Sequence, residues 1–213
     1  MLKIALAKGR LLEQIVPLLA QVGMAPSAED VKSRKLILPG PDGCEFLIIR
    51  AADVCTFVER GAADIGIVGR DLLLEACPQV YEPLDLRIGR CRLCVAAPQD
   101  HPDPMLLEAG STMRVATKYD RLAADFFRDR GIQAELIHLY GSMELAPLVG
   151  MADCIVDLVE TGGTLRANGL VERATIIDIS SRLIVNPASY ATKSAQIQPL
   201  IRQLRQLVAG QGN

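Results

Sequence analysis

The residues most suited to chemistry lie between positions 155 and 166, where an apolar run gives way to carboxylates and then to Thr-Gly-Gly-Thr. Asp157 and Glu160 stand just before Thr161-Gly162-Gly163-Thr164. Glycines let backbone N–H groups point at a phosphate, threonine hydroxyls add donors, and the N-terminus of a following helix adds positive potential. Carboxylates accept hydrogen bonds from sugar hydroxyls, so the segment predicts a sugar-phosphate site. A plain strand-to-helix turn is the alternative, because short glycine motifs are not specific.

Cationic side chains form a second candidate group in the N-terminal half. Lys8 and Arg10 flank the turn after the first predicted strand, Arg34 precedes another strand, and Arg50 follows a third. Arginine binds phosphate through a planar fork, and the carboxyl ends of strands in an open α/β sheet line the ligand crevice. These positions predict a site for a pyrophosphate-sized anion. Arginine also outnumbers lysine along the whole chain, so the base composition of the gene is an alternative explanation.

Other kinds of catalysis find little support. His101 lies in a proline-rich loop and His138 within an apolar run, which favours structural roles for both. Cys91 and Cys94 fall in a predicted strand, where a spacing of three puts them on opposite faces, so we expect structural thiols rather than a metal site. The sequence contains no Gly-x-Ser-x-Gly, Walker A or Gly-x-Gly-x-x-Gly motif. The reactions that remain as candidates are displacement at an anomeric carbon and phosphoryl transfer, since both depend on positioning and charge stabilisation.

Alternating strand and helix patterns must position these residues. Helical spacing of apolar residues predicts a helix at 11–22. Asp53 is the predicted N-cap of a helix that ends near residue 60, and Asp71 begins the next helix. Apolar runs predict strands at 2–7, 35–38, 45–50 and 65–69. This alternation indicates an α/β fold.

One pattern occurs twice. Gly61-x-Ala63-Asp64 precedes the strand at 65–69, and Gly150-x-Ala152-Asp153 precedes a second apolar strand at 154–159. A predicted helix comes before each copy, capped by Asp53 in the first and by Ser142 in the second. The separation of the copies is too long for a solenoid repeat and suits two similar lobes. The chain is therefore predicted to be a duplication of one α/β unit.

Two connections are predicted to cross between the lobes. A long strand at 87–97 leads out of the first lobe, and strands at 175–179 and 183–186 lead back. A final helix at 190–208 has apolar residues on one face, which we expect to be buried within its own lobe. The first lobe is then discontinuous, with residues 1–90 plus 186–213, and the second covers 91–185.

Composition excludes several classes of protein. The 213 residues carry 23 Lys+Arg against 25 Asp+Glu, a net charge of −2, so no overall basic field attracts nucleic acid or anionic lipid. Trp is absent and aromatic residues make up 4%, which disfavours a base-stacking surface. The apolar runs are strand-sized and the N-terminus lacks a signal-peptide pattern, so we expect a cytoplasmic protein without a membrane span.

Taken together, these segments resemble the ATP phosphoribosyltransferase family. The resemblance implies two α/β lobes of the type II periplasmic-binding-protein kind, with a substrate cleft between them. It implies a glycosyltransferase that moves phosphoribosyl from phosphoribosyl pyrophosphate (PRPP) to N1 of ATP and releases pyrophosphate, the first step of histidine biosynthesis, with Mg²⁺ carried by the substrate phosphates. The matches run in order through nearly the whole chain: Ala5-Leu6-Ala7-Lys8-Gly9-Arg10, Ser33-Arg34-Lys35-Leu36, residues 61–71, residues 140–148, residues 157–170 and residues 180–186.

The resemblance also implies roles for single residues. Asp157 would lie beside the ribose of PRPP, and the 5-phosphate would be held by Glu160, Thr161, Gly162, Gly163 and Thr164. The catalytic cations around the pyrophosphate leaving group would be Lys8, Arg10 and Arg34. The residues that face ATP would be Arg50, Asp71 and Glu144.

The chain stops soon after its last predicted helix, as short forms of this family do. Short forms work with a separate regulatory subunit that resembles histidyl-tRNA synthetase, so the resemblance implies such a partner, and we expect a homodimer of catalytic chains. Two alternatives stay open. One is a two-lobed small-molecule binding or effector-sensing module, and the other is a different PRPP-dependent phosphoribosyltransferase.

Overall fold

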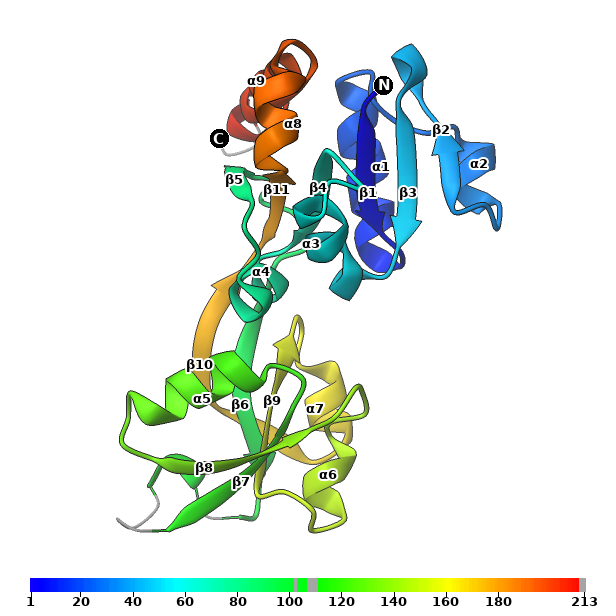
Figure 1. Ribbon diagram of the computed structural model, residues 1–213. Helices are drawn as coiled ribbons and strands as arrows, with labels where there is room; N and C mark the ends of the chain where they lie inside the picture. The colour runs from blue at the N-terminus through cyan, green and yellow to red at the C-terminus, as the bar shows by residue number, and fades with distance from the viewer. Residues whose placement is uncertain (102, 107–110, 211–213) are drawn as a thin grey trace. The chain divides into compact units, whose positions relative to one another are not determined.

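The computed structural model describes residues 1–101, 103–106 and 111–210, and it separates into two compact units (Figure 1). Unit 1 contains Met1–Gly89 and the chain from Ser180 onward, and unit 2 contains Arg90–Ile179. The second boundary lies at 179/180 rather than at the predicted 185/186. The reason is that strand β11 (Ser181–Val185) pairs with strands of unit 1.

The sheet of unit 1 has the strand order β2-β3-β1-β4-β11-β5. Its parallel centre consists of β1 (Lys3–Ala7), β3 (Glu45–Ile49) and β4 (Ile65–Gly69). β2 (Ile37–Pro39) joins β3 and β11 joins β4 in antiparallel fashion, while β5 (Tyr81–Asp85) pairs antiparallel with β11. Nearly continuous apolar runs form the central strands, because parallel strands are buried on both faces. The strands predicted at 2–7, 45–50 and 65–69 are confirmed.

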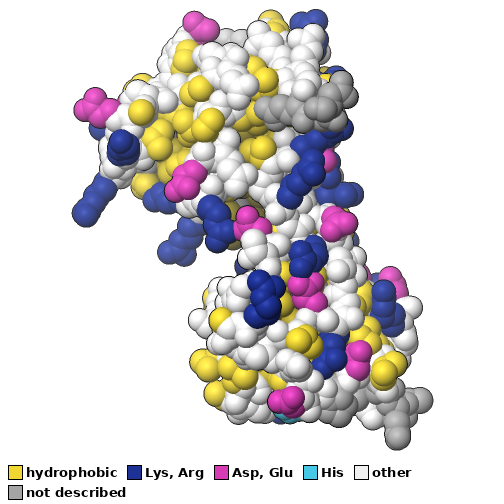
Figure 2. Space-filling view, turned by 180° about the vertical axis from the view of Figure 1, so that it is seen from behind, with side chains coloured by type: hydrophobic (Ala, Val, Ile, Leu, Met, Phe, Trp, Pro, Cys, Tyr) yellow, Lys and Arg dark blue, Asp and Glu magenta, His cyan; other side chains and the backbone are white. Residues whose placement is uncertain are grey.

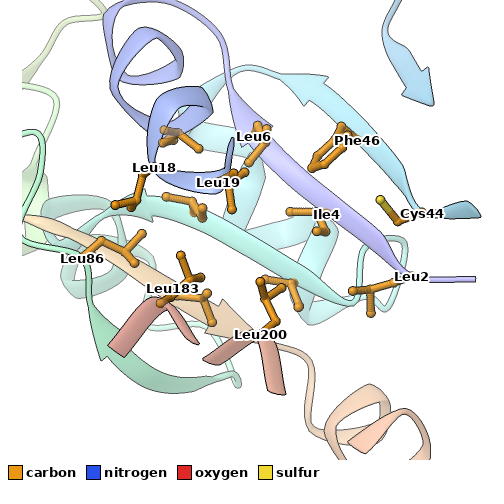
Figure 3. Packing of buried hydrophobic residues seen from close by; sticks show 14 of the residues in the cluster. Leu2, Ile4, Leu6, Leu18, Leu19, Cys44, Phe46, Leu86, Leu183 and Leu200 are labelled. Carbon is orange, nitrogen blue, oxygen red and sulfur yellow. The ribbon is translucent and has the colours of Figure 1, made fainter. Parts of the chain in front are cut away.

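Helices cover both faces of this sheet. α1 (Arg10–Gln21) and α9 (Ser194–Gly210) pack on one face, and α3 (Ala51–Glu59) packs on the other with α4 (Arg70–Ala76). Successive residues of β1 point to opposite faces, so Ile4 and Leu6 meet Leu18, Leu19 and Leu200, as Figure 3 shows. The apolar face of α9 is therefore buried within unit 1, as predicted. The shorter elements are α2 (Ala28–Lys32), α8 (Pro187–Thr192) and the 3-10 turn η1 (Pro41–Gly43).

The sheet of unit 2 has the strand order β10-β6-β9-β7-β8. β7 (Thr112–Thr117), β8 (Gln133–His138) and β9 (Cys154–Val159) are parallel, and β6 (Cys91–Pro98) lies antiparallel between β9 and β10 (Leu170–Ile179). The helical segments that follow β6, β7, β8 and β9 are η2 (Pro104–Leu106), α5 (Asp120–Arg128), α6 (Leu145–Leu148) and α7 (Gly163–Ala167). Within the described ranges, no helix is long and apolar enough to cross a membrane.

The same strand arrangement occurs in both units. The triplet β3-β1-β4 corresponds to β8-β7-β9, and an antiparallel strand lies beside each third strand, β11 beside β4 and β6 beside β9. The repeated aspartates act alike. Asp64 N–H donates to the Lys3 carbonyl and its carboxylate accepts from Lys3 N–H, both at 2.8 Å, and Asp153 makes the same two bonds with Arg114. The two similar α/β lobes predicted from the repeated pattern are confirmed, whereas their origin by duplication stays a prediction.

Both predicted N-caps are wrong. Helix α3 begins at Ala51 directly after Arg50, its N-cap, so Asp53 lies in the first turn and caps nothing. Ser142 has a left-handed φ of 53°, and α6 begins three residues later with Glu144 at the N-cap position.

Two predicted element lengths are also wrong. The strand expected at 87–97 begins only at Cys91, because Arg87 and Gly89 have positive φ angles that break the extended chain. The helix expected at 190–208 is divided at Lys193 into α8 and α9. Lys193 directs its ammonium to the buried carboxylate of Asp64, with both Nζ–O distances at 2.8 Å.

Candidate functional site

The carboxyl edge of the parallel strands in unit 1 collects the predicted cationic residues. β1 and β3 pair so that Ala7 lies opposite Ile49, and Lys8 N–H donates to the Ile49 carbonyl at 2.8 Å. Lys8 and Arg50 therefore leave the sheet next to each other, and Arg10 begins α1. These three residues are exposed, and Figure 2 shows lysine and arginine side chains on the surface of this unit.

Arg34 reaches the same edge from the opposite direction. β2 is antiparallel to β3, and Ile48 N–H donates to the Leu36 carbonyl at 2.8 Å. The chain just before Leu36, with the exposed Arg34, therefore lies near the end of β3. The structure thus places at one edge of one sheet the four cations from which the sequence predicts an anion site.

Asp71 lies at this edge but is buried, with 5% of the residue exposed. Its carboxylate folds back over the end of β4, since a Cβ built on Gly69 would lie 2.2 Å from Asp71 Oδ1. A Cβ built on Gly66 would lie 2.7 Å and 2.8 Å from side-chain carbons of Val58 and Val54 in α3. The glycines of β4 therefore make room for a carboxylate and a helix of the chain itself.

The corresponding edge of unit 2 carries a lysine and a carboxylate side by side. β7 and β9 pair with Thr117 opposite Val156, so the next residues, Lys118 and Asp157, are neighbours. Lys118 Nζ lies 3.6 Å from Asp157 Oδ1, and Leu158 N–H donates to the same oxygen at 2.8 Å. Asp157 thus has one oxygen engaged by the protein.

Burial is the main reason that the pKa of Asp157 is raised above its ordinary value. The Lys118 ammonium opposes this shift, and the negative charge of Glu144 adds to it. Glu144 therefore belongs to the edge that holds Asp157, in unit 2, whereas Arg50 and Asp71 lie in unit 1. The three residues expected to face ATP are divided between the two units.

The Thr-Gly-Gly-Thr segment forms a tight turn directly after β9. Gly162 is the N-cap of α7 with a left-handed φ of 72°, and the first intrahelical bond runs from Arg166 N–H to the Gly162 carbonyl at 3.1 Å. Thr161 and Thr164 are exposed. The N–H groups of a first helical turn have no partner within the helix. Because α7 has only five residues, local N–H groups rather than a long helix dipole are the donors that this turn can offer to an anion.

Several other candidate residues have structural contacts. His138 Nδ1 lies 2.7 Å from Asp120 Oδ2, and its ring stacks edge-on against Tyr140. All six cysteines are thiols, and Cys94 is buried on β6. The structural roles expected for His138 and Cys94 stay predictions.

Sequence reasoning missed two cations next to the predicted phosphate turn. Lys118 pairs with Asp157, and Arg92 Nη1 donates to the Glu160 carbonyl at 3.2 Å. Lys118 could have been found from the sequence, since it directly follows an apolar strand as Lys8 does. Arg92 could not, because it reaches the turn only through the pairing of β6 with β9.

The chain is similar to known proteins over most of its length. A family model described as HisG: ATP phosphoribosyltransferase matches residues 50–206. An ATP phosphoribosyltransferase of Methylococcus capsulatus is 56% identical over 211 residues, which cover 98% of this chain and 97% of that protein. A chain of the ATP phosphoribosyl transferase (HisG:HisZ) complex from Thermotoga maritima superposes on this chain with a TM-score of 0.84 at 32% identity. The match covers 99% of this chain and 100% of that one.

Binding proteins share the fold at much lower identity. The VFT2 domain of BvgS from Bordetella pertussis has a TM-score of 0.61 at 14% identity and covers 98% of this chain and 91% of that domain. This likeness shows the two-lobed, periplasmic-binding-protein-like fold alone. The family match and the high identity over the whole length go further: the chain belongs to the ATP phosphoribosyltransferase family.

Proposed function

We propose that this chain transfers the phosphoribosyl group of PRPP to N1 of ATP and releases pyrophosphate, as the first step of histidine biosynthesis. The observation that carries the proposal is 56% identity to an ATP phosphoribosyltransferase over nearly the full length of both chains. The phosphate turn after β9 and the cationic edge of unit 1 are the local features that suit this chemistry.

The turn at residues 160–164 is proposed to hold the 5-phosphate of PRPP. Its left-handed Gly162 and exposed Thr161, Gly163 and Thr164 offer backbone N–H and hydroxyl donors. Asp157, whose Oδ1 is engaged by Lys118 and Leu158, has its other oxygen to accept hydrogen bonds from the ribose hydroxyls.

The cations Lys8, Arg10 and Arg34 are proposed to stabilise the leaving group. Adenine N1 supplies a lone pair and forms the bond to the anomeric carbon, while the bond from that carbon to the pyrophosphate oxygen breaks and its electrons leave with pyrophosphate. The ribose becomes cationic and the departing oxygens more negative, so fixed positive charge beside them favours the transition state over the ground state. No strong base is needed for the attack, because N1 carries no proton.

The nucleotide is proposed to meet Arg50, Asp71 and Glu144. Arg50 is exposed and suits the triphosphate, whereas the carboxylates of Asp71 and Glu144 suit donors of the ribose or the base amino group. These assignments are proposals that substitution of each residue, with KM for ATP as the readout, would test.

Mg²⁺ is proposed to arrive with the phosphates of PRPP and ATP. Mg²⁺ prefers oxygen ligands, keeps several waters, and is often held by one or two carboxylates together with substrate phosphates. Residues 1–101, 103–106 and 111–210 contain no group of three or more His, Cys, Asp or Glu side chains placed to hold a metal. Asp157, next to the phosphate turn, can supply one carboxylate, and the ion would neutralise charge on the leaving group.

A regulatory partner is also proposed. The Thermotoga maritima structure is that of a HisG:HisZ complex, and this chain matches one chain of that complex over its whole length. We propose that this chain assembles with a subunit resembling histidyl-tRNA synthetase, and that the catalytic chains form a homodimer. Co-expression with such a subunit followed by size-exclusion chromatography tests this assembly.

The activity is tested by following the ultraviolet absorbance of N1-phosphoribosyl-ATP with purified protein, PRPP, Mg²⁺ and ATP. Offering free purine and pyrimidine bases in place of ATP distinguishes a different phosphoribosyltransferase. Absence of product with every acceptor, alone and with the regulatory subunit, would contradict the proposal. The cytoplasmic location stays a prediction, which cell fractionation would test.

A further inference from the structure

Two arginines bind consecutive carbonyl groups of the turn between β9 and α7. Arg92 Nη1 donates to the Glu160 carbonyl at 3.2 Å, and Arg166 Nη1 donates to the Thr161 carbonyl at 3.1 Å. Arg92 comes from β6, and Arg166 comes from α7 itself. The turn is therefore held through its carbonyl oxygens.

These two bonds constrain the direction of the N–H groups. In a planar trans peptide, the C=O and the N–H of one peptide unit point to opposite sides. The Glu160 carbonyl shares its peptide with Thr161 N–H, and the Thr161 carbonyl shares its peptide with Gly162 N–H. Holding both carbonyls toward the guanidinium groups turns both N–H groups away from them, where an anion can accept their hydrogen bonds.

Glu172 on β10 holds Arg92 in place. Its carboxylate accepts from Arg92 Nε at 2.8 Å and also from Arg92 Nη2, which makes a two-donor pair. The Cys94 thiol donates to Glu172 at 3.3 Å, and burial raises the pKa of this thiol to about 11, so it stays a neutral donor. Arg92 and Cys94 are two residues apart on β6 and therefore lie on the same face of the sheet.

Gly162 rests against the same groups. A Cβ built on Gly162 would lie 3.0 Å from Arg166 Nη1 and 3.5 Å from Glu172 Oε1. The absence of a side chain lets the turn approach this charged support, which is a second reason for glycine besides its left-handed φ.

We propose that Arg92 and Glu172 are positioning residues for the 5-phosphate of PRPP. Glu172 fixes the guanidinium of Arg92, and Arg92 fixes the peptide whose N–H binds the phosphate; neither side chain touches the substrate. This inference rests on the proposed function, because it takes the turn to be the phosphate site.

Charge-conserving substitutions separate positioning from a general electrostatic role. Arg92→Lys keeps the positive charge but loses the fork, and a single ammonium cannot reproduce the two parallel bonds to Glu172 together with the bond to the Glu160 carbonyl. Glu172→Asp keeps the negative charge but shortens the side chain by one methylene. If only the charges mattered, both variants would bind PRPP as the parent does.

Arg114→Lys is the matched control. Arg114 also bonds a carboxylate through Nε and Nη2, that of Asp153, and donates from Nη1 to a loop carbonyl, that of Gly150 at 3.0 Å. It lies in the same unit but at the amino end of β7 and β9, away from the phosphate turn. It therefore makes the same kind of contact without the proposed role.

The experiment measures PRPP binding to the full-length chain by calorimetry with Mg²⁺ present, and KM for PRPP and for ATP in the ultraviolet assay. Mutating a group that orients a metal ligand typically costs 10- to 100-fold in affinity, and by analogy we expect the PRPP dissociation constant to rise on the order of 10-fold in Arg92→Lys and in Glu172→Asp. We expect KM for ATP and the thermal midpoint to stay close to those of the parent, and Arg114→Lys to bind PRPP normally.

Unchanged PRPP affinity in either folded variant would overturn the proposal, and so would an equal loss in Arg114→Lys. If Arg92→Lys does not fold, Glu172→Asp decides. The proposed function is judged separately, by product formation in the parent chain, since the calorimetric comparison needs no turnover. A parent that binds no PRPP overturns both.

Discussion

The Asp64→Ala substitution should destabilise the chain more than Asp153→Ala does, although the two aspartates occupy equivalent positions of the two units. Each accepts a hydrogen bond at 2.8 Å from a backbone N–H of the neighbouring parallel strand. The surroundings differ, because the Asp64 side chain is 5% exposed and the Asp153 side chain is 42% exposed. The comparison therefore separates the shared hydrogen bond from the burial and the further partners of each carboxylate.

The magnitude follows from the partners that each carboxylate loses. Asp64 also accepts from Lys193 Nζ at 2.8 Å and from Ser189 Oγ. Removing one partner of a buried ion pair costs about 3–5 kcal/mol. Lys193 is partly exposed and keeps its bond to the Met1 carbonyl, so we expect about 3 kcal/mol, at the low end of that range.

Asp153 should contribute less. Exposed ion pairs contribute about 0–1 kcal/mol, so we expect a loss of about 1 kcal/mol for Asp153→Ala. A chain of this length loses about 2–4 °C of melting temperature per kcal/mol, which makes the expected difference between the two variants roughly 4–8 °C.

The contribution of Asp64 also depends on pH. Burial by itself would raise the pKa of Asp64, but hydrogen bonds from Lys193, Ser189 and the Lys3 N–H outweigh burial and hold the pKa below its usual value. A carboxyl whose pKa is lower in the folded state stabilises that state above its unfolded pKa, and this stabilisation is lost as pH falls through the folded pKa. The difference between the parent and Asp64→Ala should therefore persist at neutral pH and shrink below about pH 4.

Urea denaturation followed by circular dichroism measures the loss, and hydrogen exchange with mass spectrometry locates it. We expect Asp64→Ala to deprotect β1 amides and Asp153→Ala to deprotect β7 amides. Equal losses in the two variants would refute the reasoning, because burial would then make no difference. An Asp64→Ala deficit that persists undiminished at low pH would refute the ionic part of it.

Three further predictions concern the proposed site. Gly162→Ala should raise KM for PRPP in the ultraviolet assay, because the new Cβ would lie 3.0 Å from the guanidinium of Arg166. Gly131→Ala is the control: Gly131 has a similar positive φ, but open space surrounds its Cβ position, so KM for PRPP should not change. Burial raises the pKa of Asp157, so protonation of this carboxylate should lower kcat/KM for PRPP on the acid side of the pH profile, and the decline should begin at a higher pH than for an ordinary aspartate. Asp157→Asn should lower kcat/KM and abolish this acid-side decline. Arg10→Ala and Arg34→Ala should each lower kcat on the order of 10²-fold at saturating substrates, and unchanged turnover would exclude their role at the leaving group.

Local patterns were sufficient to predict the central strands and the similarity of the two units. The runs at 65–69 and 154–159 coincide with β4 and β9, because a strand covered on both faces is nearly continuously apolar. The lobe boundary could not be predicted in the same way. The strand after Ser180 pairs with β4, more than a hundred residues earlier in the chain, and no local signal specifies that partner.

Within the candidate site, too, local residues could be predicted and residues from distant strands could not. Asp157 and the turn after it are contiguous in sequence, so their types and spacing carried the prediction. Arg92 and Glu172 are 80 residues apart and meet only because β6 and β10 pair. Residues that orient a binding loop from neighbouring strands are therefore hidden from sequence patterns even when the loop itself is evident.

The two units agree at one end of their parallel strands and differ at the other. At the amino end of the parallel strands, both units keep the same aspartate bonds, Asp64 to Lys3 and Asp153 to Arg114, because these bonds hold two strands in register. At the carboxyl end the units differ, since the first presents Lys8, Arg10 and Arg50 and the second presents a glycine turn. In an open α/β sheet ligands bind at the carboxyl ends of the strands, so substitutions there alter binding while the amino ends preserve the fold.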